Sequence, residues 1–166
     1  MKVSRLIIVC LVTLLFTAGC GLLGSSTETA RNPQQVINAV GSMDMNISIT
    51  WIYPMGQQPR QTTNDYSLKI KDGLANTRLP FIGTKYSSSG FGEDAAIVFN
   101  NQPITVTQMA RGTKGEYLIS FTTKVENELF IVDLTVWDDG TVNIACKGSE
   151  RTVMNYAGEL RFPKEQ

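Results

Sequence analysis

The chain has 166 residues, with 15 Lys and Arg against 15 Asp and Glu, and it has no histidine. The balanced charge gives no electrostatic reason to expect a nucleic-acid partner. The absence of histidine excludes Ser-His-Asp and Cys-His nucleophilic centres and the usual zinc sites. The sequence also has neither a Ser-x-x-Lys motif nor a phosphate-binding glycine loop, so we expect no metal and no cofactor.

Residues 1–19 are predicted to be a signal peptide. Lys2 and Arg5 supply positive charge at its start, and residues 6–16 form an apolar run that is too short to span a bilayer as a helix. Three small residues, Thr-Ala-Gly, then precede Cys20. This ending resembles bacterial lipoproteins, in which the peptide is removed before a cysteine that carries acyl chains. The alternative is an ordinary secretory peptide that is cleaved nearby, with Cys20 incidental.

A lipid at Cys20 would hold the protein on a membrane. Each buried methylene contributes about 0.8 kcal/mol, and two or more acyl chains anchor stably where a single chain does not. Residues 20–31 contain Gly, Ser and Thr and predict a flexible tether after the lipidated cysteine. Residues 21–24 lack the acidic run typical of surface-exported lipoproteins. We therefore expect an outer membrane lipoprotein that faces the periplasm, with surface exposure as the alternative.

Three cysteines are present, Cys10, Cys20 and Cys146. Cys10 leaves with the signal peptide and Cys20 is the predicted lipid site, so the mature domain, residues 32–163, has no pair for an intramolecular disulfide. Cys146 falls on the apolar side of its predicted strand. We expect a small buried side chain there rather than a reactive thiol.

A short helix is predicted at the start of the domain. Asn32 can cap it, Pro33 suits its first position and Gly41 suits its C-terminal cap. Its apolar face consists of Val36, Ile37 and Val40. Because so short a helix is not stable alone in water, this face is expected to pack on a sheet.

A side-chain period of two predicts strands in most of the remaining chain. The first is a long one, in which Met45, Trp51 and Tyr53 share a face with two isoleucines. The expected strands are 45–53, 66–71, 74–79, 95–99, 104–109, 117–124, 130–137, 141–147 and 154–162. Turns are expected at 72–73 and 100–102. Eight or nine short strands with one short N-terminal helix predict a mainly β domain, either an antiparallel sandwich or a strongly curved sheet.

The loop 138–140 decides how the last hairpin pairs. A two-residue loop would put the two apolar sets on opposite faces, and a slip of one residue flips every side chain. Burial therefore favours a three-residue loop, with Gly140 in the left-handed region. That loop pairs Val136 with Val142, Leu134 with Ile144 and Val132 with Cys146. Similar matching predicts a loop at 125–128 in the preceding hairpin, with Thr123 opposite Phe130 and Ile119 opposite Leu134.

Several segments in order resemble one known family. These are Leu79-Pro80-Phe81-Ile82-Gly83-Thr84-Lys85-Tyr86, Lys114-Gly115-Glu116-Tyr117, Asp139-Gly140, and then Arg151, Tyr156 and Gly158. Together they resemble the Bacteroidetes lipoproteins grouped as domain of unknown function 4251, over residues 32–160. The resemblance implies a signal peptide, a lipid anchor and one compact domain, and it implies no activity.

The long irregular segment 79–94 is the best candidate binding surface. Phe81, Lys85, Tyr86 and Phe91 combine large aromatic side chains with a donor on one loop, where binding residues often lie. We expect either that this loop lines a groove for a glycan, a peptide or a partner protein, or that its aromatics fold back and plug one end of the sheet.

The acid pairs Glu93-Asp94 and Asp138-Asp139 are interpreted as turn acids, because adjacent strand residues point to opposite faces. The sequence thus favours a non-enzymatic, lipid-anchored envelope domain for binding or assembly. One alternative is a hydrolase of envelope polymers that uses carboxylates from different strands. Another is an inhibitor or immunity-like module, which would need an exposed apolar patch.

Overall fold

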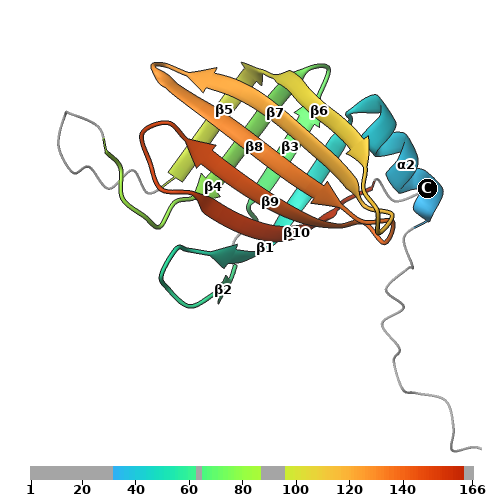
Figure 1. The fold of residues 1–166 in the computed structure, drawn as a ribbon, viewed down its shortest axis with the longest axis horizontal. Coiled ribbons are helices and arrows are strands. Elements are labelled where there is room, and N and C mark those ends of the chain that lie inside the picture. Colours follow the sequence, from blue (N-terminus) through green and yellow to red (C-terminus); the bar gives the residue numbers. More distant parts are fainter. Residues whose placement is uncertain (1–31, 63–64, 87–95, 163–166) are drawn as a thin grey trace, which may run out of the picture. The chain divides into compact units, whose positions relative to one another are not determined.

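The computed structural model describes residues 32–62, 65–86 and 96–162, so residues 1–31, with the predicted signal peptide, Cys20 and tether, lie outside the described part. The described residues form one helix and ten strands (Figure 1). These are α2 Pro33–Ser42, β1 Met45–Tyr53, β2 Arg60–Gln61, β3 Ser67–Lys71, β4 Leu74–Pro80, β5 Ala96–Pro103, β6 Thr105–Arg111, β7 Tyr117–Val125, β8 Glu128–Val136, β9 Thr141–Gly148 and β10 Met154–Leu160.

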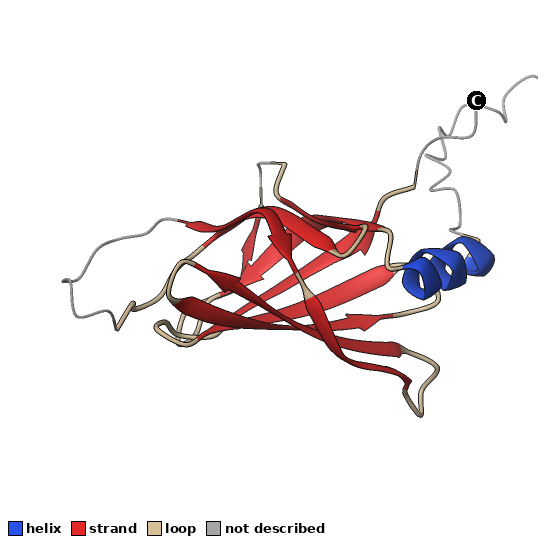
Figure 2. Cartoon of the chain, turned by 90° about the horizontal axis from the view of Figure 1, so that it is seen from above, coloured by secondary structure: helices blue, strands red, loops and turns tan. Residues whose placement is uncertain are grey.

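All ten strands belong to one antiparallel sheet. Its order is β5-β4-β3-β1-β10-β9-β8-β7-β6, and β2 pairs on β1. The sheet curls into a nearly closed, barrel-like form, in which β6 to β9 pass in front of β3, β4 and β5 (Figure 1), with the helix at one end (Figure 2). The prediction of a mainly β domain is confirmed, and of the two predicted forms the chain adopts the curved sheet.

The two walls of the sheet meet through their inward side chains. The rings of Phe99 on β5 and Phe130 on β8 pack edge to face, with centroids 5.2 Å apart. Near the opening between the two edge strands, β5 and β6, Thr123 Oγ1 on β7 donates to the Pro103 carbonyl at the end of β5, at 2.9 Å. Strands that are distant in the sheet order therefore close one shared core, which explains why inward residues of nearly every strand are buried.

The predicted register of the meander is confirmed. Val136 pairs with Val142, Leu134 with Ile144 and Val132 with Cys146. Gly140 has a φ of +80°, as the three-residue loop requires. In the preceding hairpin, Thr123 pairs with Phe130 and Ile119 with Leu134, as predicted. That loop is tighter than expected, because Val125 and Glu128 still pair and only two residues connect them.

The long strand β1 departs from simple alternation. Its pairing with β10 shifts between Ile49 and Trp51, so that Thr50 is an extra residue. A bulge of this kind reverses the side-chain directions beyond it. Ile52 is therefore buried, whereas Trp51 is 40% and Tyr53 38% exposed. The prediction that both aromatics share one face of β1 with Met45 and the two isoleucines is wrong.

Two boundary predictions are also wrong. The helix continues past Gly41 to Ser42, and Met43 caps it in the left-handed conformation (φ 52°). Ile37, on the expected apolar face, is 41% exposed. The chain does not turn at 100–102, because β5 continues to Pro103. There, Asn101 has a φ of 48° and exchanges two hydrogen bonds of 2.8 Å with the Asn76 side chain, which accommodates a second bulge.

Candidate functional site

The first half of the predicted binding loop runs back along the β9–β10 connection. After β4 ends at Pro80, residues 84–86 lie beside residues 150–152. Three contacts hold them: Lys85 and Arg151 form an isolated antiparallel bridge, the Tyr86 N–H donates to the Glu150 carbonyl at 2.6 Å, and the Thr152 N–H donates to the Thr84 carbonyl at 3.0 Å. This part of the loop is therefore fixed to the barrel by its backbone.

A buried ion pair lies beside this segment. Arg151 donates from Nε to Glu128 Oε1 at 2.7 Å and from Nη2 to Oε2 at 2.5 Å, and both side chains are less than a tenth exposed. The guanidinium carbon also lies 5.0 Å from the ring centre of Phe81 and 5.1 Å from that of Phe130. The bidentate ion pair and the two aromatic rings together compensate for the hydration that the Arg151 guanidinium loses on burial. We refer to these four residues as the arginine clamp.

A buried phenol adds a second link at the same end. Tyr156 OH on β10 donates to the Pro80 carbonyl at 2.8 Å. Burial raises the pKa of Tyr156 far above its ordinary value and raises the pKa of the neighbouring Cys146 to about 12. Both groups are therefore neutral at physiological pH. Cys146 is fully buried, as the sequence predicts.

The structure separates the predicted binding residues. Phe81 is half-buried in the arginine clamp and Lys85 is half-buried in the bridge, whereas Tyr86 is 67% exposed. Phe91 and the acid pair Glu93-Asp94 lie outside the described residues. The described aromatics of the loop thus have different environments, one packed against the barrel and one in solvent.

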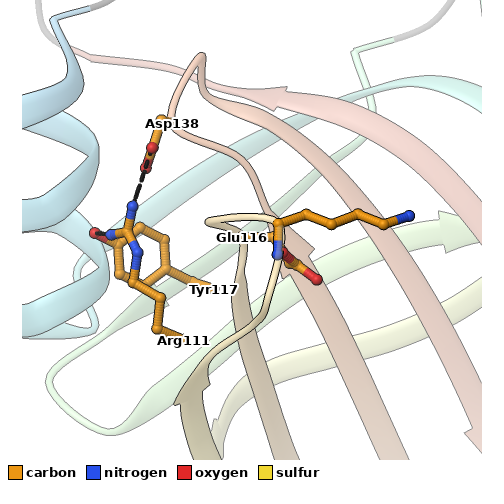
Figure 3. A network of polar contacts seen from close by, with 5 residues as sticks. Arg111, Glu116, Tyr117 and Asp138 are labelled. Carbon is orange, nitrogen blue, oxygen red and sulfur yellow. Dashed lines mark hydrogen bonds and ion pairs between the residues drawn. The ribbon is translucent and has the colours of Figure 1, made fainter.

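A second polar cluster joins β6, β7 and the β8–β9 loop (Figure 3). The Arg111 guanidinium carbon lies 4.4 Å from the ring centre of Tyr117, and Nη1 donates to the phenol oxygen. Nη2 donates to both carboxylate oxygens of Asp138, at 3.1 and 3.0 Å. Asp139 accepts from the N–H and the hydroxyl of Thr141, at 2.8 and 2.7 Å. Both acids of this pair thus bond to neighbouring parts of the fold.

The β1–β2 hairpin presents a surface that sequence reasoning missed. Trp51, Tyr53 and Met55 are all exposed, Met55 to 66%. β2 returns beside them and pairs Gln61 with Trp51. The sequence signal for this surface was Ile52. Ile49 and Ile52 would point to opposite faces of a regular strand, so both can be buried on one face only if the strand contains an extra residue between them.

Metal and membrane features were sought in the same part of the chain. Among the described residues, no group of three or more His, Cys, Asp and Glu side chains is arranged to hold a metal ion. None of the described helical segments has the length and hydropathy needed to cross a membrane.

The comparisons with known proteins agree with the predicted family. Residues 27–160 match the model described as Domain of unknown function (DUF4251). A crystal structure of a DUF4251 family protein from Bacteroides eggerthii superposes with a TM-score of 0.61 at 13% sequence identity, over 79% of this chain and 87% of that one. At this identity the likeness shows the fold. No curated protein matches the chain.

Proposed function

This chain belongs to the DUF4251 family, and because the description of that family names no activity, we propose from its own residues that it is a lipid-anchored cell-envelope protein. Its domain serves in binding or assembly and does not catalyse a reaction. The anchor is Cys20, and the domain faces the periplasm from the outer membrane. Its partner is a glycan, a peptide or another protein of the envelope.

The segment that ends at Cys20 carries the proposal of an anchor. It has a positive start, an apolar run and small residues directly before the cysteine. The family match begins at residue 27, which is after this segment. The signal and the cysteine therefore precede the folded domain, as an anchoring sequence should.

Three acidic groups of the described domain are held by neighbouring residues, which favours a binding role over hydrolysis by these groups. A glycoside hydrolase needs two carboxylates about 5 to 10 Å apart, free to act on a bound sugar. In the described domain, Glu128 is buried against Arg151, Asp138 is bonded by Arg111 and Asp139 by Thr141. Each of these acids stabilises the fold through a neighbouring group.

Mass spectrometry of the processed protein tests the anchor. The protein is isolated from the membranes of a cell that lipidates such sequences, and its N-terminal peptide is analysed beside that of a Cys20→Ala variant. We expect acyl chains on Cys20 and partition of the processed protein into the detergent phase, with no acyl chain on the variant. An unmodified Cys20 would refute the proposal. Release of fragments from purified envelope polymers would refute the non-enzymatic part.

Protease treatment of intact cells tests the side of the membrane. A protein that faces the periplasm is degraded only after the outer membrane is opened. Degradation on intact cells would place the domain at the cell surface instead.

A further inference from the structure

The β1–β2 hairpin concentrates exposed apolar side chains. Eight large hydrophobic residues of the described chain are exposed, and three of them, Trp51, Tyr53 and Met55, lie within five positions. The bulge at Thr50 turns the two aromatics outward together. The hairpin projects beyond the wall of the barrel (Figure 1), so these side chains can reach a partner without rearrangement of the sheet.

The chemistry of the hairpin favours a phospholipid surface. Trp and Tyr combine an apolar ring with one polar group, and they are enriched where a bilayer meets water. Residues 51–62 contain one basic residue, Arg60, and no acidic residue. No carboxylate of the hairpin therefore opposes its approach to anionic headgroups. Gln57 and Gln58 at the tip supply amides that can bond to headgroups.

The length of the tether is compatible with this contact. The 12 residues from Cys20 to Asn32 can span at most about 40 Å when extended. β1 begins three residues after the helix, and its nine residues cover about 30 Å. The extended tether is therefore longer than β1 itself, which is compatible with contact between the far end of β1 and the surface that holds the acyl chains.

We propose that Trp51, Tyr53 and Met55 insert into the headgroup region of the membrane that carries the anchor. The inference rests on the proposed lipid anchor and adds a second contact to it. The two contacts together orient the domain on the bilayer, with the barrel wall beyond the hairpin turned away from the lipid. Insertion also raises membrane affinity, since each buried apolar side chain adds to that of the acyl chains.

Tryptophan quenching tests the insertion, because the chain has two tryptophans, Trp51 and Trp137. The acylated full chain is reconstituted in vesicles of phosphatidylethanolamine and phosphatidylglycerol that contain brominated lipid. A Trp137→Phe variant reports on Trp51 alone, and a Trp51→Phe variant reports on Trp137. We expect bromine to quench Trp51 and not Trp137, and vesicles to protect Trp51 from aqueous acrylamide. Thermal unfolding of both variants checks that they are folded.

Four results would overturn the inference. If the protein floats with the vesicles but Trp51 is not quenched, the anchor stands and the inserted hairpin fails. If both tryptophans are quenched equally, the domain has no fixed orientation. If the protein does not float, the anchor and the insertion fail together. If soluble envelope glycans protect Trp51 from acrylamide without vesicles, the occupant is a glycan.

A second measurement isolates the hairpin from the acyl chains. In the mature chain, residues 20–166, with Cys20→Ala, the exposed aromatics are the expected membrane contact. Adding Trp51→Ser is expected to lower partition into the same vesicles by roughly tenfold, because it removes one large apolar side chain from the interface. A matched change at exposed Met109 on β6 should leave the partition unchanged. Equal effects at both positions would contradict the proposal.

Discussion

The Arg151→Ala substitution is expected to destabilise the domain strongly, because it leaves the Glu128 carboxylate buried without its bidentate partner. The Arg151 and Glu128 side chains are only 6% and 8% exposed. Breaking one partner of such a pair costs about 3–5 kcal/mol. The guanidinium also lies against the rings of Phe81 and Phe130, so contacts with two aromatic faces are lost as well.

The expected change is within the range that a denaturation experiment can follow. A domain of this size has a free energy of unfolding of about 5–15 kcal/mol. With a urea dependence of about 2 kcal/mol per molar, a loss of about 4 kcal/mol lowers the midpoint by about 2 M. The variant should therefore remain folded in water if the wild type is of ordinary stability.

The exposed pair Arg111–Asp138 provides a matched control. It has the same chemistry and two hydrogen bonds, but its side chains are 47% and 48% exposed. Exposed pairs contribute about 0–1 kcal/mol, so Arg111→Ala should lower the urea midpoint by less than about 0.5 M. Equal midpoints for Arg111→Ala and Arg151→Ala would refute the reasoning from burial.

A double-mutant cycle separates the ion pair from the aromatic contacts. Glu128→Met with Arg151→Met replaces both charges with apolar side chains of similar length. Such replacements are often neutral or stabilising, so the double variant should be more stable than the single Arg151→Met variant, which leaves Glu128 buried without its partner. A double variant less stable than either single variant would show that the charges themselves are required.

Three further predictions follow from single positions. Gly158→Ala should destabilise the domain by about 1–3 kcal/mol in urea unfolding, because its Cβ would lie 2.2 Å from the Ser48 carbonyl oxygen. Gly41→Ala meets nothing within 4 Å and should stabilise the helix by about 0.5–1 kcal/mol. A Gly158→Ala variant more stable than Gly41→Ala would contradict the close approach at Gly158. Cys146 should resist thiol reagents at pH 8 until the protein unfolds, since burial raises its pKa to about 12, and labelling of the native protein would refute this. Gly140→Val should cost more stability than Gly140→Asn, because the φ of +80° strains a β-branched residue most.

The parts of the fold that could be predicted are those in which one face is buried. In β8 and β9, buried and more exposed positions alternate over whole strands, and only one register buries both inward apolar sets. That constraint identified the pairing of Val132 with Cys146 and the three-residue loop. Local sequence was sufficient because neighbouring strands of a meander pair with each other.

The bulges could not be predicted in the same way. In β1, large apolar residues occupy every second position from Met45 to Tyr53, and only Ile52 departs from this pattern, yet Thr50 is an extra residue. A bulge depends on the partner strand, and this one lies in the pairing of β1 with β10, which is the last strand of the domain. The same reason applies to Asn101, whose left-handed conformation is stabilised by Asn76 on β4.

The ion pair was missed because Glu128 was assigned to a loop. Glu128 lies two residues before Phe130 and four before Val132, so it points to the same side of the strand. Extending the predicted strand back to Glu128 would have placed this residue on the buried face. An acidic residue on a buried face requires a partner. No local pattern identifies that partner as Arg151, which is 23 residues away and lies beyond β9.

Several residues that carry the family resemblance have structural contacts in this fold. The Pro80 carbonyl accepts from Tyr156, Phe81 packs on Arg151, and Gly158 allows the close approach of β1. If these groups formed a binding site, their polar atoms should face solvent, but Tyr156 and Arg151 are buried. These residues therefore stabilise the fold of this chain, and its binding specificity is better sought among its exposed side chains. By that argument Tyr86 is the one described aromatic of the 79–94 loop that remains a candidate for binding, beside the aromatics of the β1–β2 hairpin.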